Sequence, residues 1–153
     1  MPESTVSGER ALAARTLTPG RAEGPAFVLE GPLSFWGGVD SASGRVIDGR
    51  HPRFGEALSG RVVLLPAGRG SSSSSSVLAE MVRAGTAPAA IVFLESDAIL
   101  VLGAVVAGEL YGRSLPMVQL DEHDYRSIQT GDHVTVEAFE ADAVLRIRAA
   151  PIR

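Results

Sequence analysis

Six consecutive serines, Ser71 to Ser76, follow the tripeptide Gly68-Arg69-Gly70 and form the stretch of this sequence best suited to chemistry. They lie between an apolar run typical of a buried strand, Arg61 to Pro66, and a run with helical spacing that begins at Val77. A glycine-rich turn between a strand and a helix leaves the first backbone N–H groups of the helix unpaired, and the helix dipole adds partial positive charge there. The pattern therefore predicts a binding site for an anionic ligand group.

Two simpler interpretations compete with a binding site. Serine runs are common in flexible linkers, and serine is also a good helix N-cap. The apolar runs on both sides favour a site over a linker, since linkers usually join polar segments. The turn lacks the lysine of a Walker A phosphate loop and has no G-x-G-x-x-G pattern, so nucleotide binding is disfavoured.

A second candidate cluster, Ser34 to Asp40, contains the single tryptophan of the chain and two adjacent glycines. Adjacent glycines indicate a close backbone approach or a positive φ angle. We expect Phe35 and Trp36 to be core or interface anchors, and Ser34 and Asp40 to be possible supporting residues of the site. The sequence after Asp40 is equally typical of a plain turn.

A third candidate, His51, lies beside Arg50 and Arg53. Neighbouring positive charge suits a neutral, hydrogen-bonding histidine better than a metal ligand. We therefore take His51 as a possible supporting residue. The other two histidines, His123 and His133, are isolated in the sequence and are expected at the surface, so we predict no metal site in this chain.

Composition limits the classes of function. The 153 residues, 45% of them hydrophobic, are enough for one compact domain with a real core. The net charge of −4, with 14 basic and 18 acidic residues spread along the chain, disfavours nucleic-acid binding. No apolar run approaches the roughly 20 residues of a membrane span, and no signal peptide is evident, so we predict a cytoplasmic protein. The chain has no cysteine, so any cysteine-held metal would have to come from a partner.

The elements that would position these residues are strands, which dominate both ends of the chain, and a few helices. Residues 1–9 are polar and are expected to be a flexible tail, and 10–153 are expected to form one domain. A βαβ unit is predicted in the middle, with parallel strands at 61–65 and 89–93 joined by a helix at 75–84. Residues 97–107, apolar at nearly every position, are expected to be either a buried helix or a strand and a turn. The other expected elements are strands at 12–17, 26–29, 45–47 and 117–120, a helix at 122–128 capped by Asp121, and a hairpin of 133–137 with 143–147.

Six motifs together resemble the small subunit of aconitase X, over roughly residues 10 to 120. They occur in the family's order at compatible spacings: Ser34 to Asp40, Gly44 to Pro52, Gly60 to Pro66, Gly68 to Ser71, Ala87 to Ile91, and Gly103 to Ala107. The resemblance implies a mixed β/α fold, the swivelling β/β/α domain that corresponds to the fourth domain of aconitase, with a β-rich, barrel-like core and a central βαβ unit. It also implies a heterodimer with a large subunit that holds an iron–sulfur cluster through its own cysteines, and no cofactor bound by this chain alone.

Family membership would make this chain part of a hydro-lyase, or dehydratase, acting on a small hydroxy acid. In aconitase-like enzymes a Gly-x-Gly-Ser-Ser-Arg turn carries a serine that removes a proton from carbon, and that serine matches Ser71. The motif's arginine falls on Ser73, so a guanidinium for the substrate carboxylate would have to come from Arg69 or from the large subunit. We expect Gly70, Ser72 and Ser73 to bind substrate oxygens.

The resemblance leaves the substrate open. The family acts on cis-3-hydroxy-L-proline in bacteria and on mevalonate 5-phosphate in archaea, and an alanine- and arginine-rich composition favours the bacterial substrate. A domain that binds an anion or regulates a partner, without catalysis, is the alternative outside the enzymes. Whichever of the two substrates the enzyme uses, we expect the chain to be inactive without its large subunit.

Overall fold

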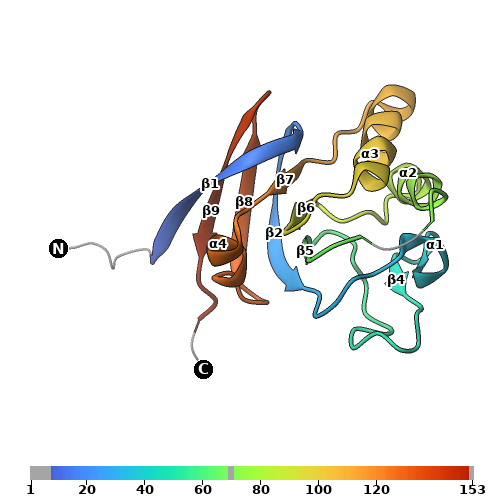
Figure 1. Ribbon diagram of the computed structural model, residues 1–153, viewed down its shortest axis with the longest axis horizontal. Helices are drawn as coiled ribbons and strands as arrows, with labels where there is room; N and C mark the ends of the chain where they lie inside the picture. The colour runs from blue at the N-terminus through green and yellow to red at the C-terminus, as the bar shows by residue number, and fades with distance from the viewer. Residues whose placement is uncertain (1–7, 69–70, 152–153) are drawn as a thin grey trace.

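Seven strands form a closed barrel in the order β1-β7-β6-β5-β2-β8-β9 in the computed structural model, which describes residues 8–68 and 71–151 (Figure 1). The strands are β1 (Glu9–Thr18), β2 (Gly20–Val28), β5 (Val62–Leu65), β6 (Ala90–Phe93), β7 (Met117–Gln119), β8 (His133–Ala138) and β9 (Asp142–Arg148). The pairs within β2, β5, β6 and β7 are parallel, and the remaining pairs are antiparallel. Strand β1 pairs with both β7 and β9 and so closes the barrel. The expected mixed β/α class with a barrel-like core is confirmed.

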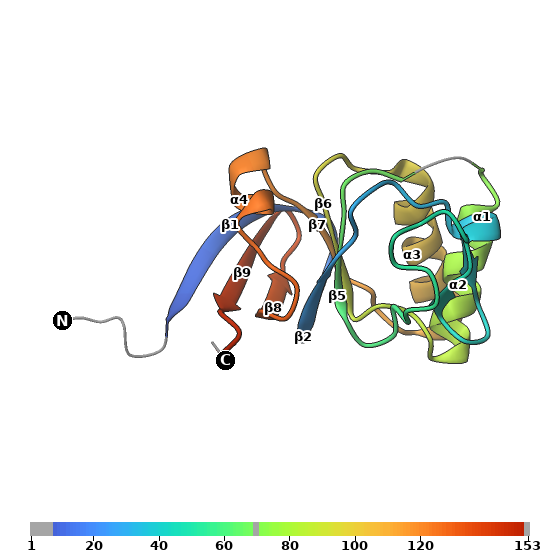
Figure 2. The ribbon, with the colours of Figure 1, turned by 90° about the horizontal axis from the view of Figure 1, so that it is seen from below.

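Two longer helices cover the outside of the parallel strands. Helix α2 (Ser74–Ala84) connects β5 to β6, and α3 (Ala98–Tyr111) connects β6 to β7, and the two lie side by side in both views (Figure 2). The short α4 (Glu122–Arg126) lies at one end of the barrel. A helical turn, α1 (Phe35–Gly38), and a two-stranded ribbon, β3 (Val39–Asp40) with β4 (Arg45–Val46), complete the helical side.

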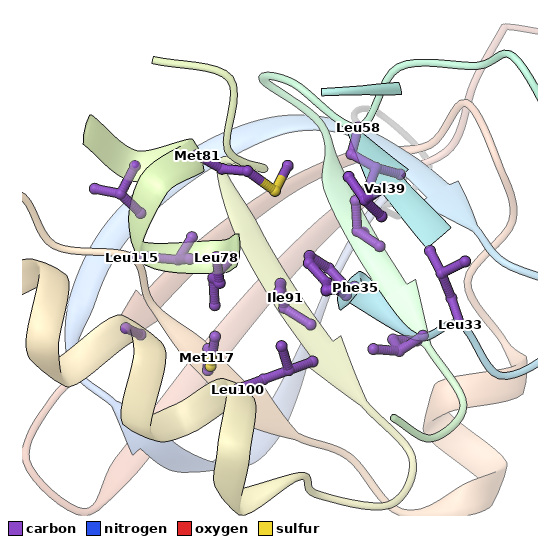
Figure 3. Close-up of a cluster of buried hydrophobic side chains, with 14 of the residues drawn as sticks. Leu33, Phe35, Val39, Leu58, Leu78, Met81, Ile91, Leu100, Leu115 and Met117 are labelled. Carbon is purple, nitrogen blue, oxygen red and sulfur yellow. The ribbon is translucent and has the colours of Figure 1, made fainter. Parts of the chain in front are cut away.

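The parallel strands are buried on both faces, because one face lines the barrel and the other meets the helices. In β5, Val62 and Leu64 belong to the core inside the barrel, whereas Val63 and Leu65 belong to the core beneath the helices. Figure 3 shows this second core, in which side chains from α2 and α3 meet the sheet and the α1 turn. Burial on both faces explains why these strands are apolar at every position rather than at alternate ones.

Most local predictions of secondary structure are confirmed. The βαβ unit is present, and α2 ends as predicted at Gly85, which adopts a left-handed conformation with φ 81°. Asp121 caps α4 by accepting a hydrogen bond from Asp124 N at 2.8 Å, although α4 ends at Arg126 instead of at residue 128. Strands β1 and β2 are longer than predicted, and β1 already begins at Glu9, inside the predicted tail. Residues 1–7 of that tail lie outside the described residues.

The apolar segment at 97–107 is a helix, and its burial differs from the expectation. Helix α3 buries one face, which carries Leu100, Gly103, Ala104 and Ala107, and exposes the opposite one. None of the helices in the described part of the chain is long and apolar enough to cross a membrane.

Candidate functional site

The serine turn follows β5 at the carboxyl edge of the four parallel strands. Gly68, just before the turn, pairs with Leu33 in an isolated parallel bridge. This bridge brings the segment that leads into Ser34 beside the segment that leads into Ser71. Ligands bind at the carboxyl edge of parallel strands both in open α/β sheets and in α/β barrels, so the position suits a binding site.

The first serines of the run form a tight turn before α2. The hydroxyl of Ser71 accepts a hydrogen bond from Ser73 N at 3.0 Å, and the carbonyl of Ser71 accepts one from Ser74 N at 3.0 Å. Ser71 is half-buried, whereas Ser72 and Ser73 are exposed. The turn therefore presents three hydroxyl groups near the N-terminus of an eleven-residue helix, as the sequence predicts. Arg69 and Gly70, the other predicted ligand-binding residues, lie outside the described residues.

Ser74 links two of the predicted clusters, a role that the sequence pattern does not indicate. Its side chain is buried, and its hydroxyl accepts a hydrogen bond from Trp36 N at 3.1 Å. The sequence predicts a helix from residue 75, and Ser74 is the first residue of α2 in the structure. A serine that caps a helix and one that ties it to another segment have the same local sequence, so no signal distinguishes them.

Ser34 shapes the α1 turn beside the serine run. Its hydroxyl donates to the carbonyl of Trp36 at 2.9 Å, and Gly37 takes a positive φ of 81°. Phe35 is fully buried, which confirms it as a core anchor. Trp36 is 58% exposed, so it is not a core residue, and its role as an interface anchor stays a prediction.

Asp40 lies at the far end of α2 from the serine turn. Its carboxylate accepts hydrogen bonds from the Ser43 hydroxyl at 2.6 Å and from Ser43 N at 3.1 Å, and these bonds lower the pKa of Asp40. The same β3–β4 turn is tied to the C-terminal end of α2, because the Thr86 hydroxyl donates to the carbonyl of Ser41 at 2.6 Å. Eleven helical residues span about 16 Å, so the structure does not bring Asp40 to the serine turn. Its environment is the plain turn that the sequence also allowed.

His51 is buried beside the segment that leads to Ser34. Its Nδ1 accepts a hydrogen bond from Arg53 N at 3.0 Å, and its Nε2 lies 3.5 Å from the carbonyl of Gly31. His51 therefore contacts backbone groups, and its supporting role in a site stays a prediction. The described residues contain no group of three His, Asp or Glu side chains that could hold a metal ion.

Two hollows flank the Gly31–Pro32 segment at this same edge. One, of about 340 Å³, is lined by His51, Asp48 and Arg50. The other, of about 420 Å³, is lined by the residues that follow β2, β5 and β6, together with Tyr125 and Arg126. Neither of these two hollows is lined by a serine of the turn.

Comparisons with known proteins found a matching family and several relatives. The family described as the aconitase X swivel domain matches residues 11–145. The cis-3-hydroxy-L-proline dehydratase of Pseudomonas aeruginosa is 54% identical over 108 residues, which cover 71% of this chain and 19% of that protein. The phosphomevalonate dehydratase small subunit of Methanothermobacter thermautotrophicus is 43% identical over 110 residues, which cover 72% of this chain and 79% of that one.

The match covers a much smaller share of the hydroxyproline dehydratases than of the phosphomevalonate dehydratase small subunit. The cis-3-hydroxy-L-proline dehydratase of Hypocrea jecorina is 44% identical over 76% of this chain, and the match covers only 20% of that protein. This chain therefore spans about a fifth of the length of both hydroxyproline dehydratases.

Solved structures share the fold. The crystal structure of Thermococcus kodakaraensis aconitase X in its holo-form superposes with a TM-score of 0.77 at 32% identity, covering 89% of this chain and 98% of that one. A UPF0107 protein solved by NMR superposes with a TM-score of 0.76 at 36% identity, covering 88% and 97%.

Proposed function

Because this chain belongs to the aconitase X swivel-domain family, we propose that it is the small subunit of a hydro-lyase that dehydrates a small hydroxy acid. The observation that carries the proposal is the serine turn, which lies at the carboxyl edge of the parallel strands with Ser71 only half-buried. Such a turn is one side of an active site, and a large subunit would supply the other side.

Ser71 is the proposed base. In a dehydration, a base removes a proton from one carbon, hydroxide leaves the adjacent carbon, and a double bond forms between the two. Ser71 would take the proton as an alkoxide, and the exposed hydroxyls of Ser72 and Ser73, together with Arg69 and Gly70, would bind substrate oxygens. The proximity of Ser34 through the Trp36–Ser74 contact supports its inclusion as a positioning residue.

The chain alone provides little of the stabilisation that an alkoxide needs. One backbone donor, Ser73 N, lies 3.0 Å from the Ser71 hydroxyl. A helix N-terminus adds at most about 2 kcal/mol, and each pKa unit corresponds to about 1.4 kcal/mol. The pKa of a serine hydroxyl must be lowered by many units before it can act as a base near neutral pH. A closed, water-poor site with further hydrogen-bond donors is therefore required. We therefore propose that the isolated chain is inactive.

The residues of this chain do not fit an iron–sulfur cluster. The sequence has no cysteine, and no metal-binding group of three His, Asp or Glu occurs within 8–68 and 71–151. We propose that the large subunit holds the cluster, and the roles assigned to Ser71, Ser72 and Ser73 do not depend on its geometry.

The proposed substrate is cis-3-hydroxy-L-proline. The support is the 54% identity to the Pseudomonas aeruginosa dehydratase, against 43% for the archaeal small subunit, together with the composition. Mevalonate 5-phosphate is the alternative substrate. The purified complex of this chain with its large subunit should dehydrate cis-3-hydroxy-L-proline and leave mevalonate 5-phosphate unchanged. Activity on mevalonate 5-phosphate alone would favour the alternative substrate, and activity on neither would overturn the proposal in favour of a binding domain without catalysis.

The role of Ser71 is tested in the same complex. Ser71→Ala should lower kcat by about 10²- to 10⁴-fold, the usual contribution of a general base. The matched control is Ser114→Ala, since Ser114 is exposed beyond the C-terminal end of α3. Near wild-type turnover of Ser71→Ala, with the iron content of the complex unchanged, would rule out Ser71 as the base.

A further inference from the structure

The outer face of α3 is apolar and exposed. Leu102 is 54% exposed and Leu110 is 65% exposed, with Val105 and Val106 between them. From Ala98 to Gly108 the helix carries no charged side chain on any face. Helices that are apolar all round are normally buried on all sides, so this face has the composition of an interface rather than of a solvated surface.

A groove runs between α2 and α3 along this face. Its volume is about 310 Å³, and its α3 wall consists of Leu102, Val106, Leu110 and Tyr111. The two helices approach closely at Gly103, where a Cβ atom would lie 2.8 Å from the carbonyl oxygen of Ser75. The walls of the groove are therefore held at a fixed spacing by backbone contact.

The groove begins next to the serine turn. Its α2 wall includes Ser75 and Ser76, the residues that directly follow the turn, and then Ala79 and Glu80. A partner protein that covers Ser71 to complete the proposed active site would therefore lie beside the end of the groove at Ser75 and Ser76. The position of the groove is what distinguishes it from other exposed apolar positions, such as Phe139 in the turn between β8 and β9.

We propose that the groove between α2 and α3 docks an apolar segment of the large subunit. The inference rests on the proposed function, because the large subunit is the body that would close over Ser71. In the two hydroxyproline dehydratases the matching part is about a fifth of one chain, whereas the archaeal relatives carry it in a separate small subunit. A separate subunit must be held by its own surface, and the α3 face is a preformed apolar surface that borders the site.

The test measures the affinity of this chain for its large subunit by isothermal titration calorimetry. The double variant Leu102→Gln/Leu110→Gln should raise the Kd at least tenfold, because two amides replace the apolar side chains and glutamine keeps a good helix propensity. Phe139→Gln is the matched control, since Phe139 is 62% exposed and lies away from the groove, and its Kd should stay within twofold of wild type. Far-UV circular dichroism checks that α3 is retained.

Three outcomes separate this inference from the proposed function. An unchanged Kd for the double variant in an active dehydratase complex overturns the docking inference and leaves the function standing. If the double variant binds the large subunit tenfold more weakly but the wild-type complex has no dehydratase activity, the docking inference is supported and the proposed function is overturned. If light scattering shows that the chain alone forms a dimer that the double variant abolishes, without any change in Kd for the large subunit, the groove is a self-association surface and the docking inference is wrong.

Discussion

The hydroxyl of Ser74 accepts a hydrogen bond from the backbone N–H of Trp36 at 3.1 Å, and this bond joins the start of α2 to the α1 turn. Ser74→Ala would leave the Trp36 N–H without its acceptor in a partly buried position. We expect the free energy of unfolding to fall by about 1–3 kcal/mol, the usual cost of an unsatisfied buried group. Urea unfolding measures it. Ser76→Ala, at an exposed position of the same helix, should not destabilise the protein, and equal stabilities for the two variants would contradict the role of the bond.

The crossing of α2 and α3 depends on the absence of a side chain at Gly103. A Cβ there would lie 2.8 Å from Ser75 O and 3.1 Å from Ser75 Cα, which are backbone atoms that cannot rotate away. Gly103→Ala should therefore lower the free energy of unfolding by about 1–3 kcal/mol. Gly108→Ala is the control in the same helix, since its nearest contact is 3.8 Å away. Alanine should stabilise that position by about 0.5–1 kcal/mol, so thermal unfolding should shift in opposite directions for the two variants.

Gly68 leaves room for the carboxylate that starts α3. A Cβ at position 68 would overlap the Asp97 side chain, whose Oδ1 accepts hydrogen bonds from Ile99 N at 2.8 Å and Leu100 N at 3.2 Å. Gly68→Ala should displace this cap and cost about 0.5–2 kcal/mol in chemical unfolding. Gly49→Ala, which would meet nothing within 4 Å, is the control.

A double-mutant cycle tests this mechanism. In the variant Gly68→Ala/Asp97→Ala the cap is already lost through the second substitution. The double variant should therefore lose less free energy of unfolding than the two single variants lose together. Full additivity would show that Gly68→Ala destabilises the protein by a mechanism that does not involve Asp97.

Tyr125 makes stability depend on alkaline pH. Its side chain is buried at the end of the barrel, its hydroxyl has no hydrogen-bond partner among the described residues, and burial raises its pKa. Below about pH 10 both the folded and the unfolded state hold the proton, so its contribution is constant. Above pH 10 the unfolded state loses the proton and the folded state keeps it, so stability falls by up to about 1.4 kcal/mol per pH unit.

Tyr125→Phe removes this ionisation. Urea unfolding at pH 8 and pH 11 should show a smaller loss of stability for the variant than for the wild type. At pH 8 the variant should be at least as stable, because an unsatisfied buried hydroxyl has been removed. Equal losses in both proteins would place the alkaline sensitivity in other residues.

Local signals made part of this fold predictable. Gly85 ends α2 and Asp121 starts α4 because a left-handed glycine and a capping carboxylate act within one turn of the helix. The hairpin of β8 and β9 follows from alternating side chains on two adjacent segments. The serine turn was predictable for the same reason, since a strand, a glycine-rich turn and a helix are consecutive in the sequence.

Features that depend on distant segments were not predictable. Asp40 lies at the far end of α2 because the Ser41–Thr86 contact joins residues that are 45 positions apart. Both faces of α3 are apolar, so hydrophobic periodicity could not distinguish the exposed face from the buried one. The pairing of β1 with β7 and β9 leaves no trace in the local pattern of either strand.

The pairing of β1 also sets the order in which this chain can fold. Residues 9–14 of β1 pair only with β9, so they have no partner strand until the last strand has been synthesised, whereas the end of β1 can pair with β7 earlier. The βαβ unit can assemble earlier, from neighbouring segments, whereas barrel closure requires a contact between the two ends of the domain. Folding dominated by such long-range contacts is slow, in milliseconds to seconds, and until β9 has formed, the β9-facing edge of β1 exposes unpaired backbone groups.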